Sequence, residues 1–166
     1  MITIDIDEAL LRHIPRNQQL KIKLEIDTDP PPGFQTTNKY ILLPIPFAVR
    51  AYSLPDLFAG KMHAVLCREW KTRVKGRDWY DFVWFTARHP GLRLFHLEAR
   101  MRQTGHWQGT PKLTPERFHE ILSKRINRID INQARQEVEP FVKDPQSLAV
   151  WSIDFFLDIA SRIKFV

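Results

Sequence analysis

The chain has 166 residues, of which 43% are apolar, and this is enough for one globular domain with a sizeable core. The net charge of +6 and the pI near 9.7 suit a polyanionic partner without identifying one. No apolar run reaches transmembrane length and no signal-peptide pattern opens the chain, so we expect a cytoplasmic protein that does not act at a membrane. The single cysteine, Cys67, excludes an internal disulfide and a cysteine-based zinc site, and we interpret it as a small buried residue.

The first predicted strand, residues 1–8, alternates isoleucines with polar residues. The alternation places Asp5 and Asp7 on one side of the strand, as chelation of a metal ion requires. A polar edge strand explains the same pattern, and we prefer it because no glycine-rich helix start precedes the two acids.

The clearest strand is predicted at residues 20–27, where apolar side chains alternate with charged ones. Glu25 and Asp27 lie on its charged face. This pattern indicates either that they are acids of an active site or that the face is the exposed side of an edge strand. Two further strands are predicted at 39–43 and 47–52, interrupted by prolines and leading directly into a helix.

Two helices joined by a basic turn are predicted between residues 53 and 85. Ser53 is a good N-cap, Pro55 suits the first turn, and Asp56 favours the positive end of the helix dipole. A basic run ends this helix, and a second helix begins near Asp78. The residues expected to face inward are Leu54, Leu57, Phe58, Met62, Val65 and Leu66 from the first helix, and Trp79, Phe82, Val83 and either Phe85 or Trp84 from the second.

Three polar residues interrupt these apolar faces: Lys61, Asp78 and Asp81. The two acids are three residues apart and therefore share a helical face. The simplest interpretation is that Lys61 is solvated and that Asp78 pairs with Arg77 or Lys75.

The remainder of the chain is predicted to be helical, with Pro90 and Gly91 marking the change. Helical spacing is found at 92–103, 114–127, 130–142 and 146–164. The last helix is expected to carry an apolar stripe of Leu148, Trp151, Phe155, Ile159 and Ile163. Residues His96, His106 and His119 lack metal-ligand spacing and are interpreted as surface or partly buried histidines. We predict an α+β fold with a small mixed sheet in an α/β part at 1–90 and a helical part at 91–166, packed as one unit.

The stretches DLFAGKMHAVLCR and KGRDWYD resemble the AbiEii/AbiGii family of nucleotidyltransferase-like toxins. That family carries the patterns D-L-x-A-x-K-x-x-A-x-x-x-R and K-x-R-D-x-Y-D, and the resemblance covers roughly residues 20–90. It implies a toxin of a type IV toxin–antitoxin or abortive-infection system that acts in phage defence. It also implies Mg²⁺, a nucleoside triphosphate as substrate and a separately encoded antitoxin. The implied acceptor of the nucleotide is tRNA, another RNA or a protein.

The resemblance also implies roles for residues of this chain. Lys61 would contact the nucleotide phosphates, Asp78 would act as base or orient a cation, and Asp81 would hold a metal-bound water or a partner cation. The other implied residues are Lys75 and Arg77 on phosphate, and Glu25 and Asp27 on the metal.

The chain departs from the family pattern at its first motif, a glycine-rich turn followed by a strand with paired acids. None of the glycines precedes such a strand, so we expect a truncated or degenerate member with weak or no transferase activity on its own. The alternative is a non-enzymatic basic α/β domain that binds nucleic acid or a protein. A metal-dependent nuclease is less favoured because its E-x-K order is not matched.

Overall fold

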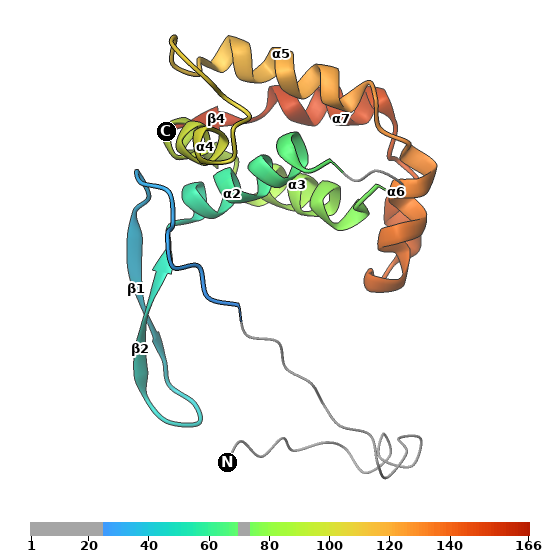
Figure 1. The fold of residues 1–166 in the computed structure, drawn as a ribbon. Helices are drawn as coiled ribbons and strands as arrows, with labels where there is room; N and C mark the ends of the chain where they lie inside the picture. The colour runs from blue at the N-terminus through green and yellow to red at the C-terminus, as the bar shows by residue number, and fades with distance from the viewer. Residues whose placement is uncertain (1–24, 70–73) are drawn as a thin grey trace, which may run out of the picture. The chain divides into compact units, whose positions relative to one another are not determined.

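The computed structural model describes residues 25–69 and 74–166. The chain divides into two compact units, residues 1–30 and residues 31–166, and each is considered by itself. The second unit combines helices with two small sheets, which confirms the predicted α+β class (Figure 1). Among the described residues, no helix has both the length and the apolar character needed to cross a membrane.

The described end of the first unit, residues 25–30, carries two of the predicted site residues. Glu25 and Asp27 are exposed and lie outside any strand, so the strand predicted at 20–27 does not extend over them. Asp27 Oδ1 instead accepts the backbone N–H of Asp29 at 3.1 Å, a side-chain turn ahead of the prolines. The other predicted acids of this unit lie outside the described residues: Asp5 and Asp7.

The second unit begins with an antiparallel hairpin of β1 (Thr36–Ile41) and β2 (Phe47–Tyr52). Ile41 is paired with Phe47 at the loop end of the ladder. Both predicted strands of this region are confirmed, the first beginning earlier than expected. The hairpin projects from the start of the helix that follows it (Figure 1).

Helices α2 (Leu54–Cys67) and α3 (Gly76–Arg88) confirm the predicted helix pair. Ser53 starts α2, but its hydroxyl donates to the carboxylate of Asp56 rather than capping a backbone N–H. The prediction that Leu54 and Leu57 face inward is wrong, since each is 41% exposed. The next apolar residue along the helix, Phe58, is fully buried in the core.

The rest of the unit is mainly helical. The elements are β3 (Gly91–Leu92), α4 (Leu94–Gln103), α5 (Pro115–Ile126), α6 (Ile131–Val138), the 3₁₀ turns η1 (Glu139–Phe141) and η2 (Pro145–Leu148), α7 (Ile153–Ser161) and β4 (Lys164–Phe165), which pairs in parallel with β3.

The last predicted helix is broken in the structure. The Ser152 hydroxyl accepts the backbone N–H of Phe155 at 3.1 Å, which starts α7 at Ile153 and leaves η2 as a separate turn. Phe156 rather than Phe155 is therefore fully buried. An apolar stripe alone did not reveal this interruption, because both segments bury apolar residues in the same core.

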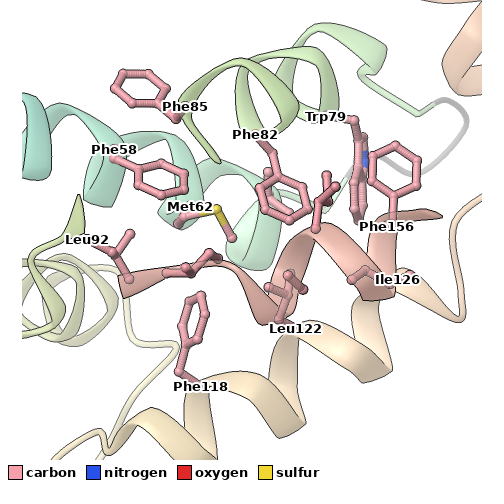
Figure 2. Close-up of a cluster of buried hydrophobic side chains, with 14 of the residues drawn as sticks. Phe58, Met62, Trp79, Phe82, Phe85, Leu92, Phe118, Leu122, Ile126 and Phe156 are labelled. Carbon is pink, nitrogen blue, oxygen red and sulfur yellow. The ribbon is translucent and has the colours of Figure 1, made fainter. Parts of the chain in front are cut away.

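Aromatic side chains from α2, α3 and α7 meet in the core (Figure 2). Phe58 stacks on Phe85 with ring centroids 5.0 Å apart, and Phe82 contacts Phe156. Phe85, and not Trp84, is the buried residue at the end of α3. Burying each such ring stabilises the fold by about 1.5–3 kcal/mol, so α2 and α3 are held in one fixed arrangement.

Candidate functional site: a cationic cleft at helices α2 and α3

Lys61 of α2 and Asp81 of α3 form an ion pair, with Nζ 2.6 Å from Oδ2. Phe58 lies one turn before Lys61, and Phe85 lies one turn after Asp81. The stacked aromatic pair therefore positions the two charged residues opposite each other at the rim of the core. Their side chains are 45% and 33% exposed, so a solvent-borne ligand can reach both.

Asp78 lies one helical turn before Asp81 and is 7% exposed. Its Oδ2 is 3.5 Å from an Arg68 guanidinium nitrogen. Burial raises the pKa of Asp78 above its ordinary value, while the charges of Arg68, Lys75 and Lys61 act to lower it. Asp78 is thus a desolvated carboxyl group within the field of several cations.

Two adjoining cavities meet at this acid. One has a volume of about 340 Å³ and the other about 230 Å³, and Ala64, Arg68 and Asp78 line both. We call the two cavities together the α2–α3 cleft. The larger cavity is lined by Ala64, Val65, Arg68, Glu69, Val74, Lys75, Asp78, Trp79, Arg125, Arg128 and Ile129. The smaller one is lined by Tyr52, Asp56, Leu57, Gly60, Lys61, Ala64, Arg68, Asp78 and Arg100.

Cations outnumber acids around this cleft. Arg125, from α5, donates through Nε to the carbonyl of Val65 at 3.0 Å and through a terminal nitrogen to the carbonyl of Arg68 at 2.7 Å. These carbonyls end α2, where a cation is favoured by the helix dipole. Arg125 therefore fixes α5 against the larger cavity as well as adding charge to it.

Asp56 lines the smaller cavity, and its carboxylate makes one ion pair and accepts two hydrogen bonds. It is 1% exposed, and its Oδ1 lies 2.8 Å from Nε of Arg93. Its Oδ2 accepts from the Ser53 hydroxyl at 2.5 Å and from the backbone N–H of Gln35 at 2.9 Å. Asp56 joins the residue before β1, the start of α2 and the residue before α4, which is a structural role.

The structure brings the three predicted catalytic residues together. Lys61 and Asp81 are paired, Asp78 is adjacent, and Lys75 lines the larger cavity. Arg77 lies elsewhere: its guanidinium is 4.8 Å from the centre of the Phe141 ring. Its Nε is 4.0 Å from the carboxylate of Glu137, and it lines neither cavity. The predicted metal ligands belong to the first unit: Glu25 and Asp27.

Sequence reasoning assigned no role to Arg68, Arg125 or Arg128. Arg68 had a signal, because it is the last residue of the D-L-x-A-x-K-x-x-A-x-x-x-R pattern and lies two turns after Lys61 on one helical face. Arg125 in α5 and Arg128, two residues after it, had none, since only the folded chain places this helix end beside α2.

The neighbouring acids Asp78 and Asp81 do not fit a magnesium site. Mg²⁺ requires oxygen ligands in near-octahedral geometry, usually including ionised carboxylates. Asp81 is neutralised by Lys61, and Asp78 lies beside Arg68 with a raised pKa. A divalent cation at these two acids would have to displace both basic side chains, so we assign no metal to them.

Comparison with known proteins identifies a family. The sequence model of a family described as "Nucleotidyl transferase AbiEii toxin, Type IV TA system" matches residues 3–159. No curated protein and no solved structure matches the chain. The family match extends on both sides of the stretch that carries the lysine helix and the RDWYD sequence.

Proposed function

We propose that this chain, which belongs to the AbiEii nucleotidyltransferase toxin family, binds a nucleoside triphosphate in the α2–α3 cleft and transfers its nucleotide, weakly when the chain acts alone, to a hydroxyl group of an RNA or a protein. The family membership supports a nucleotidyltransferase-type toxin with a nucleotide substrate and an antitoxin partner. The observation that carries the finer proposal is that Lys61, Arg68 and Asp78 line adjoining cavities.

The charges of the cleft suit a triphosphate. Lys61 acts as a point charge at the exposed rim, and Arg68 presents a planar guanidinium able to bind two phosphate oxygens. Arg125 and Arg128 extend the cationic lining along the larger cavity. Its volume of about 340 Å³ falls within the range of small-molecule sites.

Asp78 is the proposed general base. It would accept the proton of the acceptor hydroxyl while that oxygen forms a bond to the α-phosphorus and pyrophosphate leaves. Burial raises the pKa of this carboxyl group and so makes it a better proton acceptor than an exposed aspartate. Asp81 is a positioning residue, because its ion pair holds the Lys61 ammonium at the rim.

The metal and the acceptor remain predictions from the family. A divalent ion, when bound, would supply charge neutralisation at the phosphates. Glu25 and Asp27, both exposed in the first unit, remain predicted metal ligands. Arg77 and Lys75 remain proposed contacts to phosphate, and of these only Lys75 lines the cleft.

Titration with a fluorescent nucleoside triphosphate, with and without Mg²⁺, tests the proposal. Lys61→Ala and Arg68→Gln should each weaken binding roughly tenfold or more, since a hydrogen bond to a charged group contributes about 1.5–3 kcal/mol. Lys143→Ala is the matched control, because Lys143 is exposed and lines neither cavity. Equal affinities in all four proteins would contradict the proposed site.

A basic domain that binds nucleic acid without catalysis is the second candidate. The guanidinium groups of the larger cavity would contact an RNA backbone as readily as a triphosphate. Competition separates the two: a triphosphate site should release its nucleotide poorly to random-sequence RNA. Full displacement by RNA, with strong salt dependence, would favour the second candidate.

A further inference from the structure

A histidine and cysteine cluster lies apart from the cleft. Among the residues that the structure describes, His63, Cys67 and His106 each offer one ligand atom within 4.8 Å of the other two. None of the three lines either cavity of the cleft. We propose that these three side chains bind one zinc ion, which ties α2 to the turn that follows α4.

Helix α2 supplies two of the ligands. His63 and Cys67 are four residues apart, so both side chains project from the same face of the helix, one turn apart. The same spacing of two ligands on a helix is used by zinc enzymes that carry paired histidines. Two ligands are therefore held by regular backbone before any metal binds.

The turn after α4 supplies the third ligand. Gly105 adopts a positive φ of 77°, and the backbone N–H groups of His106 and Trp107 both donate to the carbonyl of Met101, at 2.8 and 3.1 Å. This turn folds the chain back over the end of α4. His106 is thereby brought to α2, although it lies far from Cys67 in the sequence.

The hydroxyl of Thr104 orients both imidazoles. Its Oγ1 lies 2.9 Å from Nε2 of His63 and 2.9 Å from Nδ1 of His106. Thr104 therefore holds both rings in fixed orientations beside Cys67 of the same cluster. The two histidine rings also lie at 89° to each other with centroids 6.2 Å apart.

The distances suit a tetrahedral ion after a small adjustment. Zinc–ligand bonds of about 2.0–2.3 Å place neighbouring ligand atoms roughly 3.4–3.6 Å apart. The three atoms present lie within 4.8 Å, so closing the set needs a movement of about 1 Å. His106 is exposed and can make this movement, and its exposure leaves a fourth position to water.

The ligand chemistry favours a borderline metal over magnesium. Two imidazoles and one thiolate match zinc, whereas Mg²⁺ prefers oxygen ligands.

Metal titration of the untagged, reduced full chain tests the site. One equivalent of Co²⁺ should produce the thiolate-to-metal charge-transfer band and the intense visible bands of a tetrahedral site, and Zn²⁺ should displace it. Zn²⁺ should also raise the melting temperature, because it binds the folded chain preferentially. His106→Ala should weaken Zn²⁺ binding roughly tenfold or more, and Cys67→Ala should remove the charge-transfer band.

Controls separate this site from incidental binding. His119→Ala should bind like the original chain, because His119 contacts Phe118 and Phe165 and is not part of the cluster. His106 is exposed, so its alanine variant should fold even if Cys67→Ala does not. Absence of a charge-transfer band in the original chain, or equal Zn²⁺ affinity in His106→Ala, would overturn the proposal.

Discussion

Replacing Gly76 with alanine should destabilise the fold, although alanine is the better helix former. Gly76 is the first residue of α3, and a Cβ atom built on it would lie 2.0 Å from the carbonyl oxygen of Ala134 in α6. Real Cβ atoms essentially never approach another atom closer than 3.0 Å, so the two helices must separate by about 1 Å.

The separation would strain contacts that join α3 to α6. The backbone N–H of Val74 donates to the side-chain oxygen of Gln133 at 2.8 Å, and that of Arg77 donates to the Glu137 carboxylate at 3.2 Å. Overpacking of this kind costs about 1–3 kcal/mol. The gain in helix propensity is only about 0.5–1 kcal/mol, so the net effect is a loss.

Gly60→Ala is the matched control, with the opposite sign. Gly60 lies inside α2, and an added Cβ would make ordinary contacts of 3.6–3.8 Å with the Arg100 side chain. The propensity gain then stands alone, and stability should rise by about 0.5–1 kcal/mol. In a chain of this length, 1 kcal/mol corresponds to about 2–4 °C in melting temperature.

Thermal and urea unfolding of the two variants measure these changes. Gly76→Ala should melt below the original chain and Gly60→Ala above it. If Gly76→Ala were as stable as the original chain, the close packing of α3 on α6 would be refuted.

Two other substitutions test buried carboxyl groups. Burial raises the pKa of Asp78, so its protonated form favours the folded state. The resulting contribution to the free energy of unfolding is complete below the ordinary pKa of 3.8 and is lost as pH rises through the higher pKa of the folded state. Asp78→Asn should therefore remove this pH dependence, leave the free energy of unfolding at pH 7 unchanged or higher, and abolish nucleotide transfer. Urea unfolding from acid to neutral pH measures the first two effects. A clear loss of stability at pH 7 would contradict the interpretation. Asp56→Asn should cost about 3 kcal/mol in urea unfolding, because it leaves the partly buried Arg93 without its ionised partner, and a loss below about 1 kcal/mol would show that the pair contributes little.

Sequence patterns predicted the helices and strands whose positions depend on neighbouring residues in the chain. Apolar spacing and the basic turn were enough to place α2 and α3, and the proline-interrupted strands were confirmed as a hairpin. The break before α7 was missed, because Ser152 acts as a cap within a continuous apolar stripe. The exposure of Leu54 and Leu57 depends on which neighbours cover α2, and sequence spacing does not contain that information.

The sequence predicted the parts of the candidate site that depend on neighbours along one helix, and not those that depend on contacts between helices. Asp78 and Asp81 share a helical face, and the structure adds that Lys61 reaches Asp81 rather than Asp78. Arg77, next to Asp78 in sequence, points to α6, because adjacent residues leave a helix in different directions. The zinc site proposed above departs from the expectation that a single cysteine excludes a cysteine-based zinc site. That expectation did not consider His63 and His106 as co-ligands, and His106 reaches α2 only through the turn after α4.

The location of a bound nucleotide tests the central claim most directly. A crystal structure with a non-hydrolysable nucleoside triphosphate should show phosphate oxygens within ion-pair distance of Lys61 and Arg68, with the α-phosphorus near Asp78. A triphosphate bound on another surface, with the Lys61–Asp81 pair and the Arg68–Asp78 pair undisturbed, would contradict the account.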